Sequence, residues 1–318
     1  MKRAIFNFCS YLIALALLVW IFWYMMPPGQ FDALKRFTAT DVAILLFLTL
    51  GAYLGNGLEY YLMSSKLGFK MDIRDIILLP LAMNLAGTLL PIQGAMAYQV
   101  WFFKKKYGVS LSHGFAIAAF LYLLTMTLGG IAGVIIFVLG RTSSRLFLAV
   151  SAVFAMSSLF AVGLLFCIRK IGPFHPAADR AVGFVRSILE GVATLLKDFR
   201  MVLALTAIYM LRLLSMVAMF FWIARCLGFE VSLLALLLLN LWNMLSLILK
   251  ITPSNLGISQ LVSGVMFAMI DLPKEQGVMI SLVATLAAMV MAFSFGLPAM
   301  GYGLWEISGA ARRNDPGD

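Results

Sequence analysis

The sequence predicts an all-α polytopic membrane protein made of two inverted repeats. The chain has 318 residues, of which 63% are hydrophobic and only 12% charged, and its mean hydropathy is +0.99. Soluble domains are about 45–50% apolar and about 25% charged, so these values indicate an integral membrane protein. Two apolar regions are interrupted near their middle, at matching places in the two halves. We expect a single integral membrane domain over 1–318, with repeat one at 1–140 and repeat two at 141–318.

Six apolar runs are long enough to cross a bilayer as helices, which takes about 20 residues each. They cover approximately residues 7–27, 41–63, 111–139, 145–168, 201–226 and 276–308. The first run follows Lys2 and Arg3, as the apolar core of a signal peptide would. It ends in aromatic residues and has no small-residue cleavage site before Pro27, so we expect a retained first span.

Two further apolar regions, 75–103 and 230–271, are interrupted by LLPIQGAM (Leu89–Met96) and by ILKITPSNLGISQ (Ile248–Gln260). Proline removes a backbone donor and glycine loosens the backbone, so each region should break into two helices, some of them short for a crossing. We therefore expect each repeat to have three spans and a broken, re-entrant hairpin, about eight hydrophobic segments in all. In the alternative, both broken regions cross fully and Lys104–Lys106 lie outside.

The two halves share an ordered series of features. KLGFKM (Lys66–Met71) precedes the first broken region and CLGFEV (Cys226–Val231) precedes the second, at an offset of 160 residues. Each is followed by an apolar run, an asparagine, and then a proline and a glycine. Such a series at a nearly constant offset indicates a duplication. Because three spans per repeat is an odd number, the second repeat must be inverted relative to the first.

Basic residues assign the sides of the membrane. The net charge is +10, and with the N-terminus in the cytoplasm 16 of the 24 lysines and arginines lie inside and 6 outside. This split follows the positive-inside rule and predicts the cytoplasmic (inner) membrane, with both termini in the cytoplasm. The basic residues cluster at the ends of apolar runs, which favours contact with anionic lipid headgroups over binding of nucleic acid.

The one long polar interval, about 173–200, carries an apolar stripe at helical spacing. The stripe consists of Ala181, Val185, Ile188, Val192, Leu195 and Phe199. It predicts an interfacial helix on the cytoplasmic surface, which acts either as a connector between the repeats or as a partner-binding element.

Residues for metal binding or catalysis are scarce. Cys9, Cys167 and Cys226 form no CxxC pair, and His113 and His175 are far apart in the sequence. No Ser/His/Asp constellation, no carboxylate pair and no phosphate-binding glycine loop occurs in the sequence. We therefore expect no metal, no cofactor and no enzyme activity.

Charged residues inside the apolar segments are candidates for a headgroup site. A cation at the bilayer centre costs about 2.5–3.5 kcal/mol, so Arg212 and Lys250 should face an anion or a cavity, unless Lys250 extends to the interface. Glu59, near the inner end of its span, is either a counter-ion or proton carrier in the cavity, or the partner of a neighbouring cation.

The paired breaks predict a polar cavity near the midplane. A single Pro–Gly break is often only a kink, but breaks at repeat-related positions indicate a transport site, with helix N-termini that attract anions. Amides that individually pack helices together would line this cavity as a set. The predicted cavity residues are Arg212, Lys250, Glu59, Asn84, Gln93, Asn243, Asn255 and Gln260, and the predicted hairpin breaks are Pro91, Gly94, Pro253 and Gly257.

The stretch PSNLGISQ (Pro253–Gln260), which follows an asparagine-bearing apolar run, resembles a motif of the lysylphosphatidylglycerol synthase/flippase transmembrane family. That motif reads roughly Pro-Gly-Gly-Leu-Gly-x-x-Glu. Pro253, Leu256 and Gly257 match it in place, and Gln260 stands where the glutamate would be.

Pro91 and a glycine, Gly94, correspond to the family's first-half motif, roughly Pro-x-x-x-Gly-Glu-x-x-Arg, without its Glu and Arg. The duplicated layout extends the resemblance over nearly the whole chain, as a divergent member with the transmembrane part only. The soluble aminoacyl-transferase domain of some relatives is missing from the sequence, so lipid aminoacylation by this chain alone is not expected.

The resemblance and the paired breaks imply a lipid transporter or flippase-like protein. It would move an anionic phospholipid, a polyprenyl-phosphate or a glycolipid across the cytoplasmic membrane. One alternative is a non-catalytic membrane subunit that assists a lipid-modifying enzyme or a glycosyltransferase, held through the 173–200 helix. Another is a small-solute transporter, whose cavity would be wet and closed to lipid.

Overall fold

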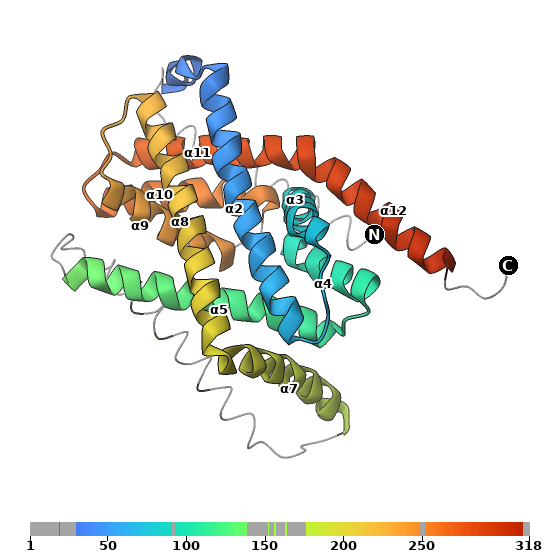
Figure 1. The fold of residues 1–318 in the computed structure, drawn as a ribbon. Coiled ribbons are helices and arrows are strands. Elements are labelled where there is room, and N and C mark those ends of the chain that lie inside the picture. Colours follow the sequence, from blue (N-terminus) through green and yellow to red (C-terminus); the bar gives the residue numbers. More distant parts are fainter. Residues whose placement is uncertain are drawn as a thin grey trace. The chain divides into compact units, whose positions relative to one another are not determined.

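The computed structural model describes residues 19, 30–90, 93–138, 152, 156, 163, 176–248 and 252–313. Among these residues all regular structure is helical and no strand occurs, as the sequence predicts (Figure 1). The elements are η1 (Gln30–Arg36), α2 (Ala39–Lys66), α3 (Ile73–Leu89), α4 (Gly94–Tyr107), α5 (Leu111–Val138), α7 (Pro176–Lys197), α8 (Phe199–Leu227), α9 (Leu233–Ile248), η2 (Pro253–Asn255), α10 (Ile258–Met269), α11 (Lys274–Met291), the π-helical η3 (Ala292–Gly296) and α12 (Leu297–Arg313).

The described residues fall into two compact units. The first unit draws on residues 1–55, 77–96 and 211–303, and the second unit on residues 56–76, 97–210 and 304–318. Some helices, α2 and α8 among them, contribute residues to both units.

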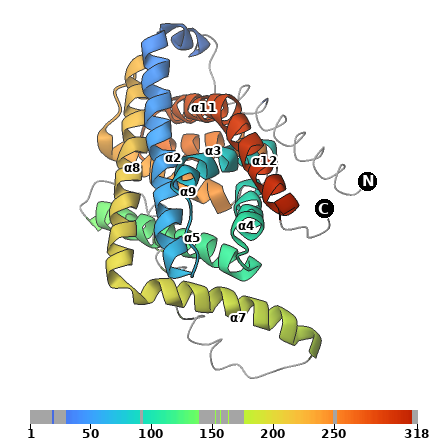
Figure 2. The ribbon, with the colours of Figure 1, turned by 45° about the vertical axis from the view of Figure 1, so that its right-hand side comes forward.

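Four helical segments are long and apolar enough to cross a membrane, and they confirm four of the predicted spans. They are α2, most of α5, α8 and the continuous stretch Lys274–Ser308, in which α11 runs through η3 into α12 (Figure 2). Large apolar side chains such as Phe47, Leu211 and Trp305 stay exposed on these helices, which favours lipid as their surroundings. The predicted spans 7–27 and 145–168 lie almost wholly outside the described residues.

The first part of α2 packs antiparallel against the last part of α8 in the first unit. Small residues on α2 allow the approach, because a Cβ added to Gly55 would lie 3.3 Å from Arg212 Cβ, and Gly51, one turn earlier, faces the same helix. Farther along, the Trp222 indole N–H donates to Asp41 Oδ1 at 3.1 Å. The two helices are antiparallel, because Asp41, earlier on α2, contacts Trp222, whereas Gly55, later on α2, contacts Arg212.

Both LGF elements end a long helix in the same way. The glycine of each is left-handed, with φ of 85° at Gly68 after α2 and 75° at Gly228 after α8. The N–H of the following phenylalanine donates to the carbonyl five residues back, at 3.1 Å and 2.8 Å respectively. This is the Schellman motif, which lets a chain leave a helix with its last carbonyls bonded. Two short helices and then a long one follow each motif; the inverted relation between the repeats stays a prediction.

Each broken region forms two short helices. α3 and α4 have 17 and 14 residues, and α9 and α10 have 16 and 12. At about 1.5 Å per residue, each is shorter than the ~30 Å core of a bilayer. The chain turns back at the second break, because the Ser263 hydroxyl on α10 donates to Asn243 Oδ1 on α9 at 3.2 Å. Re-entry of these hairpins into the membrane stays a prediction.

Helix α10 contacts both α9 and α11 in the first unit. A glycine allows the close approach to α11, because a Cβ added to Gly277 would lie 2.5 Å from the Ser263 carbonyl oxygen. The π-helical η3 precedes Pro298, whose missing N–H disturbs the helical ladder. Gly296 in η3 lies against α3, where a Cβ would come within 2.6 Å of the Leu81 carbonyl oxygen.

Helix α7 occupies the polar interval for which an interfacial helix is expected. It contacts α5 in the second unit, where the rings of Phe115 and Phe184 meet edge to face at 5.9 Å. Its stripe residues Val192 and Leu195 are buried, whereas Val185 stays exposed. The position of α7 at the cytoplasmic surface stays a prediction.

Replacing Gly68 by alanine tests the helix-ending motif. A Cβ there meets no atom within 4 Å, so the left-handed φ alone should destabilise the protein, by about 1–2 kcal/mol. We expect a lower apparent Tm in detergent for Gly68→Ala. Gly301→Ala is the matched control: this glycine lies inside α12 with equally open surroundings, and alanine should stabilise the helix by about 0.5–1 kcal/mol. Equal Tm values for Gly68→Ala and the wild type would contradict the assignment.

Candidate functional site

The second break, between α9 and α10, is held in an unusual backbone conformation. Ser254 and Asn255 have φ of 52° and 58°, and Gly257 has φ of 83°. Glycine adopts this left-handed region readily and asparagine sometimes, but at a residue such as Ser254 it costs about 1–2 kcal/mol. Strained residues of this kind cluster at functional sites, because the surrounding structure must hold them in place.

Gln260 connects the break to two helices. It is 1% exposed, and its Oε1 accepts the Gly257 N–H at 2.8 Å, which satisfies a backbone donor at the start of α10. Its Nε2 donates to Thr285 Oγ1 at 3.1 Å and lies 3.5 Å from the Ser281 carbonyl oxygen, both on α11. One amide therefore closes the backbone at the break and ties it to the next helix.

Hydroxyl groups continue this network along α10. The Ser259 hydroxyl donates to the Asn255 carbonyl at 3.0 Å, and it also lies 3.2 Å from Gln260 Oε1. One turn later the Ser263 hydroxyl bonds to the Ser259 carbonyl at 2.7 Å and to Asn243 Oδ1 at 3.2 Å. Ser259 and Ser263 are buried, so the break lies within a cluster of neutral polar groups rather than on a polar surface.

Two polar atoms at the break lack partners among the described residues. Asn255 is 6% exposed, and its Oδ1 is buried without a hydrogen bond there, as is Ser254 Oγ. A buried polar atom without a partner costs about 1–3 kcal/mol. A hydrogen-bond donor is therefore favoured at Asn255 Oδ1.

Polar residues from both broken regions meet the same stretch of α11. Asn84 Nδ2, on α3, donates to the Ala288 carbonyl at 2.8 Å, and Gln260 bonds to Thr285, one turn earlier. The structure thus brings Asn243, Asn255 and Gln260 into one network. Asn84 bonds to α11, the helix to which Gln260 also bonds.

The other predicted site residues are distributed differently. Arg212 is half-buried on α8, with its aliphatic stem against Gly55 in the first unit. Gln93 has a left-handed φ of 57° just before α4, and Gly94 begins α4 where a Cβ would lie 2.6 Å from the Ala86 carbonyl oxygen. Glu59 is fully buried, in the second unit.

Pro253, Lys250 and Pro91 are the remaining predicted positions. Pro253 is buried at the start of η2, as expected for a break. Lys250 and Pro91 lie outside the described residues, so their predicted roles stay predictions.

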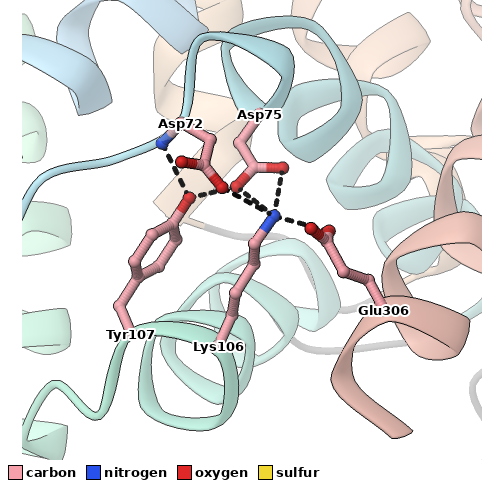
Figure 3. Close-up of polar contacts among 5 residues, drawn as sticks. All are labelled: Asp72, Asp75, Lys106, Tyr107 and Glu306. Carbon is pink, nitrogen blue, oxygen red and sulfur yellow. Dashed lines mark hydrogen bonds and ion pairs between the residues drawn. The ribbon is translucent and has the colours of Figure 1, made fainter. Parts of the chain in front are cut away.

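A charged cluster in the second unit was not predicted (Figure 3). Lys106, in the last turn of α4, lies 2.8 Å from Asp75 Oδ2 in the first turn of α3 and 2.6 Å from Glu306 Oε2 on α12. Asp72 Oδ2, just before α3, is 3.4 Å from the same ammonium. The Tyr107 hydroxyl donates to Asp75 Oδ2 and accepts the Asp72 N–H at 2.8 Å.

Burial and charge shift the pKa values in this cluster. Burial raises the pKa of the Asp75 carboxyl above its ordinary value, although the bonds from Lys106 and Tyr107 oppose the rise. Burial favours the neutral amine of Lys106, but the bonds to Asp75 and Glu306 outweigh it and raise the pKa of this ammonium. Burial therefore opposes the ionised form of Asp75, whereas the bonds to the two carboxylates favour the charged form of Lys106.

Sequence signals for the cluster were weak. Lys106 stands in a basic run that the positive-inside rule already explains, and Glu306 is 200 residues away from it in the chain. The useful signal was local: Asp75 begins a predicted helix and Lys106 ends one, where helix dipoles favour these charges. If the broken region folds back, those two ends come together.

Comparison with known families identifies the chain. The family model described as the lysylphosphatidylglycerol synthase TM region matches residues 8–296, and the chain therefore belongs to that family. No curated protein and no solved structure matches the chain. Family membership confirms the resemblance seen in the sequence and, with the four spans, identifies a multi-pass membrane protein.

Replacing Gln260 by glutamate tests the bonds of this residue. At a site 1% exposed, a carboxyl should have a pKa well above the ordinary ~4.3, because burial disfavours its charge. The protonated acid can still donate to α11, but the carboxylate cannot. The pKa of this carboxyl is then higher in the folded protein than in the unfolded chain. As the pH rises from ~4.3 to the folded-state pKa, the free energy of unfolding of Gln260→Glu should therefore fall by up to about 1.4 kcal/mol per pH unit. Apparent Tm in detergent across this pH range measures the effect.

Gln260→Met is the control, because it fills a similar volume without any hydrogen bond. It should lower Tm by an amount that does not depend on pH. A Gln260→Glu variant whose Tm runs parallel to that of the wild type at every pH would show that Gln260 does not make these bonds.

Proposed function

We propose that this member of the lysylphosphatidylglycerol synthase TM family moves an anionic lipid between the leaflets of the cytoplasmic membrane. The lipid would be a phospholipid, a polyprenyl-phosphate or a glycolipid. We propose a transporter rather than an enzyme, with no metal or cofactor in its action. The family is named for the membrane region of a synthase that makes a phospholipid, which supports a role in lipid biology.

The observation that carries the proposal is the second break. Backbone that leaves a helix at membrane depth is tolerated where protein surrounds it or where it lines a cavity, and broken helices of this kind mark binding sites in transporters. Here the break is surrounded by neutral polar groups on α9, α10 and α11, and Asn255 keeps a buried acceptor without a partner among the described residues. Such amides and hydroxyls are the groups that would bind a headgroup's phosphate and hydroxyls as it crosses.

The preference for an anion is proposed from the cations. Arg212 is half-buried within the span α8, where a cation is costly unless it faces an anion or a cavity. Guanidinium binds phosphate oxygens through two parallel hydrogen bonds, so it suits a phosphate headgroup. Lys250, just before the break in the sequence, is proposed as the second cation.

The proposed mechanism uses two opposed hairpins. α3–α4 and α9–α10 would each enter and leave on one side of the membrane, within inverted repeats at 1–140 and 141–318. The matching caps at Gly68 and Gly228, each followed by two short helices, support this arrangement. The headgroup would pass through the polar cavity between the hairpins while the acyl chains stay in lipid. Both termini would face the cytoplasm.

A membrane partner subunit is the second candidate. Phe184, Val185 and Leu196 leave apolar surface exposed on α7, which a lipid-modifying enzyme or a glycosyltransferase could cover. Replacing Val185 and Leu196 by serine separates the two functions. In the partner hypothesis, co-purification of the enzyme is lost and lipid movement is unchanged. In the transporter hypothesis, the variant purified without any enzyme still moves lipid faster than empty vesicles, which the partner hypothesis does not predict.

Arg212→Met is the direct test of the transporter. Methionine keeps much of the aliphatic stem that lies against Gly55 but removes the charge. Loss of a charge-assisted bond of about 1.5–3 kcal/mol should slow the movement of a fluorescent anionic phospholipid by roughly 10- to 100-fold. The measurement is chemical quenching of the outer-leaflet probe in proteoliposomes, with empty vesicles as background.

Arg212→Lys is the matched control: it keeps the charge but not the paired guanidinium bonds, so it should slow lipid movement less than Arg212→Met does. Lys250→Met is measured in parallel. Wild-type protein that moves the probe no faster than empty vesicles would show that the proposed function is wrong. Wild-type rates in both methionine variants would show that these cations play no part in it.

A further inference from the structure

We propose that Asp75, Lys106 and Glu306 form a proton-binding site that couples lipid movement to a proton gradient (Figure 3). The inference rests on the proposed function and supplies its energy source. All three residues belong to the second unit, so the site does not depend on how the two units are arranged.

The site holds more negative than positive charge. Asp72, Asp75 and Glu306 approach the single ammonium of Lys106, so the fully ionised cluster carries two excess negative charges within about 4 Å of one cation. Carboxylates this close to one another cannot all stay ionised at low cost unless they are well hydrated. One proton, shared among them, relieves the repulsion.

Burial selects Asp75 as the carboxylate that takes the proton. Its side chain is 2% exposed, against 35% for Glu306 and 60% for Asp72. The charged form loses most when water is removed, so the proton favours the most buried carboxylate. The raised pKa of Asp75 agrees with this choice. Glu306 and Asp72 remain open to water and give the proton a route to the site.

The groups that face Asp75 come from three elements. Helix α4 contributes Lys106, Tyr107 and Tyr98, helix α12 contributes Glu306, and the residues just before α3 contribute Asp72. The exposed Arg74 lies between the two aspartates in the sequence. The hydroxyl of Tyr98 is buried without a partner among the described residues, and burial together with the charge of Asp75 raises its pKa to about 12. This hydroxyl therefore stays neutral when a carboxylate titrates.

Protonation changes which elements are tied together. A hydronium ion from the adjoining water transfers its proton to a carboxylate oxygen of Asp75: one O–H bond breaks, one forms, and a water molecule is left. The neutral acid no longer forms an ion pair with Lys106, whose ammonium keeps Glu306 and Asp72 as partners. The start of α3 is then held less strongly to the end of α4, while α4 stays bound to α12. α3 also carries Asn84, which bonds to α11, so a shift of this helix can reach the polar network.

Infrared spectroscopy of the purified protein tests proton binding without any transport. The C=O stretch of a protonated carboxyl should appear as pH falls, at a pH above the 3.8 of an ordinary aspartate, and should be missing in Asp75→Asn. Glu306→Gln should move the titration to lower pH, because it removes a neighbouring negative charge. Since Glu306 is part-exposed, this variant keeps the test valid if Asp75→Asn does not fold.

Asp198→Asn is the control for the infrared experiment. Asp198 pairs with Lys66 at 2.5 Å in the same unit, and that bond lowers the pKa of its carboxyl. It also caps α8 through the Met201 N–H, a role that asparagine can fill. The titrating band should be unchanged in this variant. A wild-type spectrum without a titrating carboxyl, or one unchanged in Asp75→Asn and Glu306→Gln, would overturn the proton site.

Proteoliposomes with an imposed pH gradient test the coupling. The gradient should change the rate of net movement of the fluorescent anionic phospholipid. This change should be several-fold larger in the wild type and in Asp75→Glu than in Asp75→Asn or Glu306→Gln. If the wild type moves lipid at a rate that does not change with the gradient, the proton coupling is wrong but the proposed transport function is still supported. If the wild type moves no lipid, both the proposed function and the coupling fail, whatever the infrared result.

Discussion

The structure depends on one constraint: a backbone that leaves its helix in an apolar environment must still find hydrogen-bond partners. At the second break this is achieved with side chains from the same segment. Gln260 accepts the Gly257 N–H, and the hydroxyls of Ser259 and Ser263 bond to carbonyls of the break and of α10. The same side chains also bond to α9 and α11, so the groups that satisfy the backbone at the break also hold the hairpin against the next helix.

The protein separates its neutral and its charged polar groups. The break in the first unit is built from amides and hydroxyls, which can exchange one partner for another at little electrostatic cost. The cluster around Lys106 in the second unit is built from an ammonium and neighbouring carboxylates. Its net charge changes by one when a carboxylate binds a proton. We therefore propose different tasks for the two sites: reversible contact with a headgroup at the first, and a response to pH at the second.

The four spans that the structure describes could be predicted from the sequence, because length and hydropathy alone decide whether a helix can cross a bilayer. The LGF pair was recognised only as a repeat, and the structure supplies the reason, a left-handed glycine at Gly68 and at Gly228. Gln260 was predicted as a site residue, but its bonds to Thr285 and Ser281 depend on how α10 lies against α11. No pattern in the sequence fixes that packing. The contact between Lys106 and Glu306 joins residues 200 apart, which the folding of the chain determines.

The central claim is that the second break holds a lipid headgroup. An anionic phospholipid with a photoreactive group on its headgroup tests it most directly, by cross-linking in proteoliposomes followed by peptide mapping. The account predicts adducts within residues 252–263 and on the facing part of α11, and their loss when unlabelled anionic lipid competes. Adducts confined to the exposed apolar faces of α2, α5 and α8, with none at the break, would contradict it.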